Sequence, residues 1–366
     1  MKESNAPKIR LLVIANVNSS HTQKWCLALT KAGVQVGLFS INDTVADKTW
    51  LQKLDFYHIA DNKNKNPFTY LGLILRLRKI IKKYRPQIVH SHYVTNYTAL
   101  ANSAGFPLHV ATAWGSDIFV YPRKNAFNAW LMRVNLKKAG TLVSTSECMA
   151  LEMRKYTGKK VHVIPFGVDL TAFKPGKETW KNDKIVIACF KSLEPNYAQD
   201  VLLQAFYRLT QQYRNCQLKL ILAGEGSLKS SLREETKRLG LEALVEFRGW
   251  IAPSEVPAQM LSVDICVYLS KAESFGVSLL EAMACKVPLV VTPAAGFREV
   301  SSEGKYALFT EFNNAEDTAA KISQLISQSD LRNKLTESAY RHVLHKYDLE
   351  QNIKQQIELY RRLLAS

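Results

Sequence analysis

The sequence predicts an α/β fold of two units, each built around a parallel sheet. Strand-like apolar runs alternate with helical patterns from one end of the chain to the other, which is typical of βαβ units. The 366 residues are long for one ordinary core and suit two domains. A stretch with several Pro and Gly residues, Pro165–Gly176, interrupts the alternation and predicts the boundary. We therefore expect units of residues 1–165 and 166–345, and a last helix, 346–366, that crosses back to the first unit.

In the first half, apolar runs of strand length are separated by segments with helical spacing. The predicted strands are Ile9–Ala15, Gln35–Ser40, Gln87–Ser91, Leu108–Thr112, Thr141–Ser144 and Val161–Ile164. The predicted helices are Thr22–Ala32, Thr69–Tyr84, Tyr97–Ala104, Phe127–Lys138 and Cys148–Tyr156. Because helices separate the strands, we expect parallel pairing with crossover helices.

The second half restarts the same alternation and ends in helices. The predicted strands are Ile185–Cys189, Leu218–Ala223, Val245–Phe247, Asp264–Tyr268 and Leu289–Val291. Helices are predicted at Asp200–Tyr213 and Ser227–Leu239, and from Ala315 onward to a last helix, Leu349–Leu364.

The composition is that of a globular protein in a reducing compartment. Hydrophobic residues make up 47% of the chain, but no apolar run approaches the ~20 residues that span a bilayer. The N-terminus has no cleavage-site pattern of a signal peptide, and the six cysteines show no CxxC or metal-binding spacing. We therefore expect a cytoplasmic protein.

The net charge of +17 is concentrated in the first half. Residues 1–165 contain 24 Lys and Arg against 8 Asp and Glu, a net charge of +16. Much of it lies in Leu71–Arg85, where an apolar helical stripe runs beside a basic face without acids, and Arg123–Lys138 is a second basic stretch. Such a face favours anionic lipid headgroups, so we expect peripheral association with the inner face of the membrane. Nucleic acid is the rival partner, but the sequence has no recognised nucleic-acid motif.

The segment Glu273–Glu281 is the most informative part of the chain. It joins an acidic residue, a turn glycine and the start of a helix, and the apolar strand Leu289–Val291 follows. In a parallel sheet this order places a helix N-terminus at the rim where ligands bind, so that backbone N–H groups meet an anion. Three other glutamate pairs with the same spacing lack a turn glycine that opens a helix leading to the second glutamate, and we interpret them as solvated: Glu234/Glu242, Glu303/Glu311 and Glu350/Glu358.

Other catalytic patterns are missing from the sequence. Nothing forms a Ser-His-Asp set or a hydrolase elbow, and no acidic cluster of the DxD type follows a strand. His90 and His92 share one face of a predicted strand, but no third ligand is visible beside them, so we interpret them as core or site-lining residues. We expect neither a metal nor a cofactor.

Several motifs, in this order, resemble glycosyltransferase family 4, the retaining enzymes that use nucleotide sugars. The resemblance covers nearly the whole chain and implies the GT-B fold, two Rossmann-like domains facing across a cleft. It rests on Pro86–His92, Val163–Asp169 with Phe173–Pro175, Leu222–Gly226, Glu246–Trp250, and Glu273–Glu281 with Pro288–Thr292.

The resemblance implies roles for individual residues of a nucleotide-sugar site. Glu273 would contact the donor sugar near its anomeric centre, and Lys191 would neutralise the departing diphosphate. Glu281 would accept both ribose hydroxyls, which a carboxylate does well because it can bind two donors. The remaining implied contacts are the amides of Phe275, Gly276 and Val277, the glycine loop at Gly224, and Trp250 and Ile251 beside the base.

The chain also departs from the family pattern. A lysine stands at position 191 where an arginine is usual, and the lysine-glycine pair that normally follows reads Tyr197-Ala198, so one phosphate cation is missing or comes from elsewhere. Where many members have a histidine before a glycine, this chain reads Trp114-Gly115-Ser116-Asp117, so the family's contact to the donor 6-position is not expected here and Trp114 and Asp117 are assigned to the acceptor side. The loop Asn16–His21 lacks paired glycines, and Ser20 lies among its small polar residues.

The resemblance therefore implies a retaining hexosyltransferase that moves sugar from a nucleoside-diphosphate donor to a glycan or lipid-linked acceptor in cell-surface polysaccharide synthesis, such as that of lipopolysaccharide. Acceptor-reading loops such as Asp61–Pro67 belong to the first half. Two alternatives stay open at this point. One is another GT-B enzyme, such as a sugar-nucleotide epimerase or a phosphorylase. The other is a non-catalytic basic module that binds membranes or polyanions.

Overall fold

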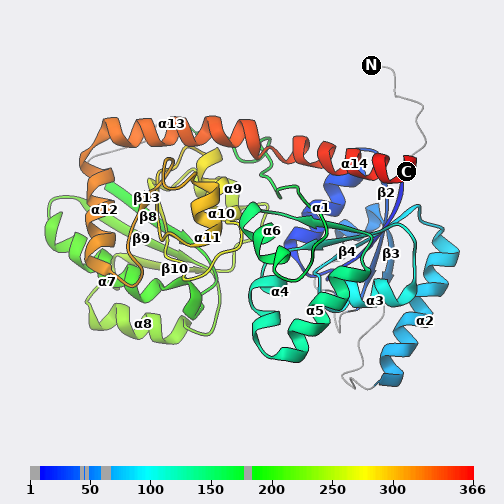
Figure 1. Ribbon diagram of the computed structural model, residues 1–366. Helices are drawn as coiled ribbons and strands as arrows, with labels where there is room; N and C mark the ends of the chain where they lie inside the picture. The colour runs from blue at the N-terminus through cyan, green and yellow to red at the C-terminus, as the bar shows by residue number, and fades with distance from the viewer. Residues whose placement is uncertain (1–8, 42–44, 46–48, 59–66, 177–183) are drawn as a thin grey trace, which may run out of the picture. The chain divides into compact units, whose positions relative to one another are not determined.

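The chain folds into two compact units (Figure 1). The computed structural model describes residues 9–41, 45, 49–58, 67–176 and 184–366, so most of the loop Asp61–Pro67 lies outside the described residues. The first unit contains Met1–Phe166 together with Leu349–Ser366, and the second contains Gly167–Asp348. The chain therefore begins and ends in the same unit.

The first unit is built on a parallel sheet with the strand order β3-β2-β1-β4-β5-β6-β7. Its strands are β1 (Arg10–Ile14), β2 (Gln35–Ser40), β3 (Asp55–His58), β4 (Ile88–His92), β5 (His109–Ala113), β6 (Thr141–Ser144) and β7 (Val161–Val163). Its helices are α1 (Ser20–Lys31), α2 (Pro67–Tyr84), α3 (Asn96–Ala104), α4 (Ser116–Phe119), α5 (Ala126–Lys138), α6 (Glu147–Arg154) and α14 (Leu349–Ala365), with the 3₁₀ turns η1 (Thr49–Lys53) and η2 (Tyr121–Arg123).

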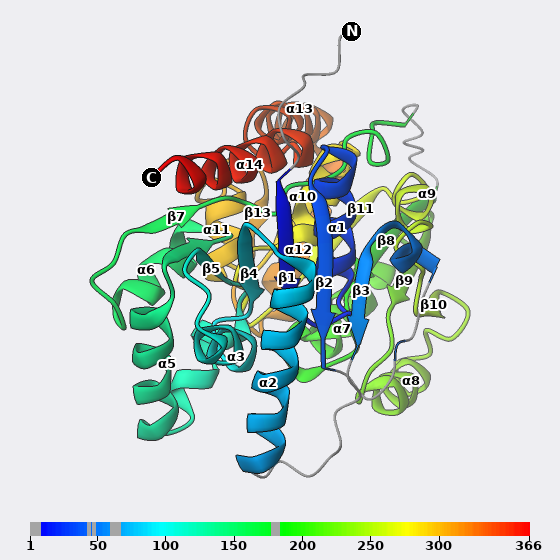
Figure 2. The same cartoon turned by 90° about the vertical axis from the view of Figure 1, so that its right-hand side faces the viewer.

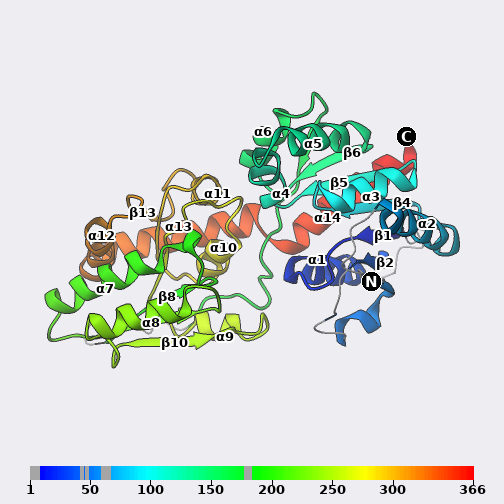
Figure 3. The ribbon, with the colours of Figure 1, turned by 90° about the horizontal axis from the view of Figure 1, so that it is seen from below.

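The helices α2, α3 and α5 share one face of this sheet. They join strands that follow one another in the same direction across the sheet, and right-handed crossovers place such helices on one side. The three lie in a row (Figure 3), with α3 in contact with both α2 and α5. The Arg78 guanidinium donates to the carbonyls of Ser103 and Ala104, and the Asn102 amide donates to the Asn135 carbonyl. The predicted apolar stripe of α2 is buried at Leu73, Leu77 and Tyr84.

The second unit repeats this architecture with the strand order β10-β9-β8-β11-β12-β13, again entirely parallel. Its strands are β8 (Lys184–Phe190), β9 (Gln217–Ala223), β10 (Val245–Gly249), β11 (Ile265–Tyr268), β12 (Leu289–Val291) and β13 (Leu308–Phe309). Its helices are α7 (Gln199–Gln212), α8 (Lys229–Arg238), α9 (Val256–Met260), α10 (Val277–Ala284), α11 (Ala295–Val300), α12 (Ala315–Ser327) and α13 (Ser329–Lys346), with the turn η3 (Pro195–Tyr197). The two predicted parallel sheets are confirmed.

The last helix, α14, packs on α1 of the first unit. The chain passes from the second unit to this helix at Asp348, which pairs with Val168 in an isolated parallel bridge. The Val168 amide also donates to the Tyr347 carbonyl at 2.8 Å. These bonds join the first and last few residues of the second unit to each other. The boundaries between the two units therefore fall after Phe166 and after Asp348.

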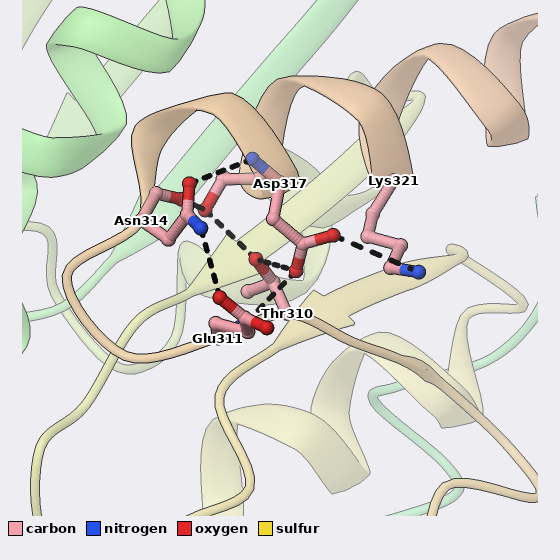
Figure 4. A network of polar contacts seen from close by, with 6 residues as sticks. Thr310, Glu311, Asn314, Asp317 and Lys321 are labelled. Carbon is pink, nitrogen blue, oxygen red and sulfur yellow. Dashed lines mark hydrogen bonds and ion pairs between the residues drawn. The ribbon is translucent and has the colours of Figure 1, made fainter.

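The start of α12 is fixed by a network of side chains (Figure 4). Asn314 caps the helix by accepting from the Asp317 amide at 2.9 Å. The Asp317 carboxylate accepts from the Thr310 hydroxyl and the Glu311 amide, and Lys321 lies 3.7 Å away. Glu311 accepts from the Asn314 amide group. Glu311 thus helps to join the end of β13 to a helix cap, a structural role.

None of the helices in the described ranges combines the length and the apolar character needed to cross a bilayer.

Candidate active site

The candidate residues of the second unit lie at one edge of its sheet. Lys191 follows β8, Gly224 follows β9, and Trp250 and Ile251 follow β10. Glu273 lies in the loop between β11 and α10. All these strands are parallel, so their carboxyl ends share an edge. β8 and β11 are neighbours whose connections leave in opposite directions, which is the switch point where α/β sheets bind ligands.

Lys191 and Glu273 meet across this switch point. The Lys191 ammonium lies 2.6 Å from a Glu273 carboxylate oxygen, and both side chains are largely buried, at 14% and 16% exposure. Burial alone would lower the pKa of Lys191, but the charge and hydrogen bond of Glu273 outweigh it and raise the pKa. The ammonium group is therefore charged at neutral pH.

Three aromatic rings surround the Lys191 ammonium. It lies 5.1 Å from the ring centre of Tyr197, 5.6 Å from that of Phe297 and 5.9 Å from that of Tyr268. Each ring face attracts a cation, and the rings restrict where the ammonium can move. The site thus holds one preorganised positive charge.

Two glycines let the loop after β9 approach the loop after β8. A Cβ atom at Gly224 would lie 2.2 Å from the Lys191 carbonyl oxygen, and one at Gly226 would lie 2.3 Å from the Leu193 carbonyl oxygen. The Leu193 amide donates to the Glu225 carbonyl at 3.0 Å. Gly224 therefore acts here by close packing that positions the Lys191 backbone.

Asn196 joins the loops that carry Lys191 and Glu273. Its side-chain amide donates to the Ala272 carbonyl and accepts from the Ala272 amide, and its own carbonyl accepts from the Lys271 amide at 2.7 Å. These three bonds hold the loop immediately before Glu273. The sequence analysis did not single out Asn196, because its role depends on the adjacency of β8 and β11.

The helix α10 starts at a glycine with a positive φ. Gly276, the N-cap, has a φ of +105°, which favours glycine, and a Cβ there would lie 2.8 Å from the Phe297 ring. Gly276 has no side chain that could cap the helix, and α10 starts after β11 at the carboxyl edge, so its first N–H groups point back toward that edge of the sheet. Val277 begins the helix, and Phe275 is buried against Tyr347, with ring centres 5.8 Å apart.

A second glycine supports the same loop from α11. A Cβ atom at Gly296 would lie 2.4 Å from the Phe275 nitrogen, and the Gly296 amide donates to the Glu273 carbonyl at 2.8 Å. Ser278, in the first turn of α10, has a buried hydroxyl without a hydrogen-bond partner among the described residues. Ser278 is a site candidate that sequence reasoning missed, although a serine just after a turn glycine was visible.

Glu281 lies four residues after Val277, about one turn further along α10, and is half-buried. Trp250 follows β10 and is 70% exposed, and Ile251 is half-buried beside it. All three therefore belong to elements at the carboxyl edge, and their roles toward a nucleotide remain predictions.

In the first unit, Asp117 is buried and bonded to backbone rather than pointing at a ligand. Its carboxylate accepts from the amides of Val94, Trp114 and Gly115 at 2.7–3.3 Å. Burial raises the pKa of Asp117, and these amides act in the opposite direction. We therefore expect Asp117 to position Trp114 and not to contact an acceptor itself.

Trp114 is the centre of an aromatic cluster at the carboxyl edge of the first sheet. Its ring centre lies 4.3 Å from that of His92, 5.1 Å from that of Phe166 and 5.9 Å from that of His21. Ser20, the first residue of α1, is exposed at the same edge. Trp114 follows β5 and Ser20 lies after β1, so both are at the carboxyl edge of the first sheet. Their role toward an acceptor stays a prediction.

The two histidines of β4 have different surroundings. The His90 ring bonds to the Tyr360 hydroxyl and the Thr112 hydroxyl, both at 2.6 Å, so both of its nitrogens are engaged. His92 is fully buried, and its ring nitrogens have no hydrogen-bond partner among the described residues. Burial lowers the pKa of His92 to about 3. Both histidines belong to the interior, as the sequence analysis expected.

Two families match consecutive parts of the chain. Residues 10–146 match the family described as glycosyl transferase 4-like, and residues 171–342 match glycosyl transferases group 1. The second match contains Lys191, Glu273 and Glu281.

Individual proteins are similar over most of the chain. N-acetyl-alpha-D-glucosaminyl L-malate synthase of Bacillus anthracis is 25% identical over 325 residues, 83% of each chain. A glycosyltransferase of Rickettsia africae superposes with a TM-score of 0.81 at 22% identity, over 98% of this chain and 99% of its own. HepE of Anabaena, crystallised with UDP and glucose, has a TM-score of 0.80 at 18% identity, over 96% and 99%. The likeness to these structures shows the GT-B fold.

Proposed function

The chain belongs to the group 1, family 4-type glycosyltransferases and is itself a glycosyltransferase, and from this premise we propose that it transfers a hexose-type sugar from a nucleoside-diphosphate donor. The observation that carries the proposal is the Lys191–Glu273 pair at the switch point of the second sheet, beside the N-terminus of α10. The pair combines a fixed cation with a carboxylate, as a ligand with phosphates and hydroxyls requires. Family membership favours transfer over the epimerase, phosphorylase and non-catalytic alternatives.

Departure of the diphosphate is the step that these groups assist. The bond between the anomeric carbon and the phosphate oxygen breaks, and the leaving diphosphate takes the electron pair. The Lys191 ammonium and the first amides of α10 stabilise the resulting negative charge, and the loss of one such preorganised donor typically costs about 3–4 kcal/mol of barrier. Glu273 holds sugar hydroxyls near the anomeric carbon, and Glu281 accepts from the ribose hydroxyls.

The acceptor hydroxyl attacks from the face that the diphosphate leaves, so the product keeps the anomeric configuration. The leaving phosphate takes the acceptor proton, and no protein base is needed. The configuration of the new linkage, determined by NMR on the isolated product, tests this step. An inverted product would exclude it.

The acceptor is a glycan or a lipid-linked glycan of cell-surface polysaccharide synthesis, such as that of lipopolysaccharide, read by the first unit at the cytoplasmic face of the membrane. The net charge of +16 in residues 1–165 supports a location beside anionic lipid. Uracil is the first base to test, because the Anabaena neighbour was crystallised with UDP.

Calorimetric binding of UDP, GDP, ADP, CMP and TDP to the wild type and to Glu281→Ala tests the donor site. We expect micromolar binding of one nucleotide, lost or weakened at least tenfold in Glu281→Ala, about 1.4 kcal/mol or more. Glu242→Ala is the control, since Glu242 ends a glutamate pair of equal spacing in the same unit and is exposed. Binding of none of the nucleotides, or equal loss in both variants, would overturn the assignment.

Transfer itself is tested with Glu273→Ala. Donor turnover should fall by orders of magnitude while the fold is retained. Unchanged donor turnover in this variant would favour the alternative that the protein is a non-catalytic basic module.

A further inference from the structure

Four large apolar side chains in the N-terminal halves of α2 and α5 are at least 50% exposed. Leu71 and Leu75 are 53% and 50% exposed on α2, and Phe127 and Trp130 are 64% and 55% exposed on α5. The Phe127 and Trp130 rings lie together, with centres 5.7 Å apart. Single exposed apolar residues are ordinary on protein surfaces, but paired sets on two helices of one layer indicate a contact surface.

Both helices change from apolar to basic along their exposed faces. On α2, Leu71 and Leu75 stand one turn apart, and the exposed positions that follow are Arg76, Arg78, Lys79, Lys82 and Lys83. On α5, Phe127 and Trp130 come first, and the exposed positions that follow are Arg133, Lys137 and Lys138. Residues three or four apart share a helix face, so each helix presents an apolar tip above basic turns.

The two apolar tips lie at the same edge of the first sheet. Both helices run from the carboxyl edge of a parallel sheet back to its amino edge, so both begin at the carboxyl edge. The 18 residues of α2 are about 27 Å long, whereas the five residues of β4 span about 17 Å. Figure 2 shows the first turns of α2 and α5 projecting past the ends of the strands. Trp114 and Ser20 lie at this same edge.

Among the residues that the structure describes, α2, α5 and the segments between them carry almost no negative charge. Between Asp61 and Glu147 the sequence has one acidic residue, Asp117, and that carboxylate is buried. Lys79, Lys82, Lys83, Lys137 and Lys138 form no ion pair with the residues that the structure describes. Their charges are therefore available to a partner.

We propose that the N-terminal halves of α2 and α5 insert into an anionic bilayer, with Leu71, Leu75, Phe127 and Trp130 among the acyl chains and the basic turns that follow at the headgroups. An apolar helix end followed by basic turns matches the order of acyl chains and anionic headgroups in a lipid interface. A protein partner would instead require a surface of complementary shape. Insertion brings the carboxyl edge of the first sheet to the membrane. This inference rests on the proposed function in one respect, since it names how the enzyme reaches a lipid-linked acceptor.

Vesicle co-sedimentation of the full chain tests the insertion. We expect binding to vesicles with about one third phosphatidylglycerol, and much weaker binding to phosphatidylcholine alone. The double variants Phe127→Ser/Trp130→Ser and Leu71→Ser/Leu75→Ser should each bind the anionic vesicles at least tenfold more weakly at about 0.15 M salt. Lys79→Glu/Lys82→Glu/Lys83→Glu should lose binding as well.

Leu151→Ser is the matched control, because Leu151 is 57% exposed on α6 in the same unit and should leave vesicle binding unchanged. Trp130 reports insertion directly. Quenching of tryptophan fluorescence by brominated lipid should be present in the wild type and reduced in Trp130→Phe.

Two results would overturn the proposal. Vesicle binding that is lost only in the lysine variant, with both apolar variants normal, would mean surface electrostatics without insertion. A change of sedimentation coefficient in the apolar variants, with normal vesicle binding, would mean that the tips join copies of this chain. Donor turnover, measured without vesicles, should be normal in all these variants, so failure of insertion is separable from failure of the transferase assignment.

Discussion

At the residue scale, the role that we propose for the Lys191 ammonium is to stabilise the departing diphosphate. Lys191→Met should lower kcat by about 10²–10³-fold, because one preorganised cation is removed from the leaving group, while KM changes much less. Lys191→Arg should retain most of the activity, since it restores the charge. Steady-state kinetics with the donor identified by calorimetry measure both effects.

The stability of the same variants separates catalysis from packing. Lys191→Met leaves the largely buried Glu273 carboxylate without its cation, which should lower the Tm. Lys191→Met/Glu273→Gln removes both charges and should recover the Tm but not kcat. Recovery of kcat in this double variant would show that Lys191 acts only by holding Glu273.

His92 makes the stability of the first unit depend on pH. Burial lowers its pKa to about 3, whereas an unfolded histidine titrates near 6.5. The unfolded state therefore binds the proton first, and stability is complete above pH 6.5 and decreases as pH falls toward the folded pKa, by up to about 1.4 kcal/mol per pH unit. His109 adds to the effect, since burial lowers its pKa to about 4.

His92→Phe should flatten this dependence. The variant removes one titrating group, and at pH 7 it should be at least as stable as the wild type because it removes from the core two ring nitrogens that have no partner in the described part of the chain. Urea unfolding between pH 4 and 7 measures the slope. His345→Gln, at an exposed position of α13, is the control, and an unchanged slope in His92→Phe would contradict the assignment.

At the element scale, the loop from Glu273 to Gly276 packs closely against α11. This contact is possible because Gly296 of α11 has no side chain. In Gly296→Ala, the new Cβ would meet the Phe275 backbone at 2.4–2.7 Å, so the loop must shift. We expect nucleotide affinity to fall at least tenfold, measured by calorimetry.

Gly72→Ala is the matched control for this substitution. Gly72 lies within α2 and a Cβ there meets nothing within 4 Å, so alanine should stabilise the helix by up to about 1 kcal/mol and leave nucleotide binding unchanged. Normal affinity in Gly296→Ala would mean that the loop adapts without loss.

Long periodic elements were predictable from the sequence, and short ones were not. The predicted ranges of α2, α5, α7, β8 and β9 differ from the structure by at most two residues at each end. The elements β3, α4, α9, α11 and β13 were missed because two to six residues carry too little periodicity. β13 has only two residues, Leu308 and Phe309, and is defined by pairing with β12.

The motif residues of the candidate site are visible in the sequence, but the contacts that the structure shows between them are not. Lys191 and Glu273 are 82 positions apart, and their contact follows from the adjacency of β8 and β11, which no local pattern contains. Asn196 and Gly296 were missed for the same reason. Asp117 was assigned to the acceptor side from the departure from the family pattern at Trp114–Asp117, whereas its bonds to the amides of Val94, Trp114 and Gly115 are visible only in the structure.

At the scale of the whole molecule, the chain closes the first unit with its last helix. The buried apolar residues of α14 are Leu349, Ile353, Ile357, Leu359 and Tyr360. The Tyr360 hydroxyl bonds to His90 in the middle of the first sheet, at 2.6 Å. The last helix therefore contributes side chains to the core of the first unit.

Ending the chain after Asp348 should destabilise the first unit and spare the second. Each buried apolar side chain of α14 contributes roughly 1.5–3 kcal/mol, so their sum is comparable to the about 5–15 kcal/mol that holds a domain folded. Hydrogen exchange followed by mass spectrometry should show lost protection in β1, β4 and α1, with protection retained in β8, β9 and β11. Tyr360→Phe is the mild counterpart, since it removes only the bond to His90 and should cost about 1–3 kcal/mol. Equal loss of protection in both sheets would mean that the two units unfold as one, whatever the last helix contributes to the first.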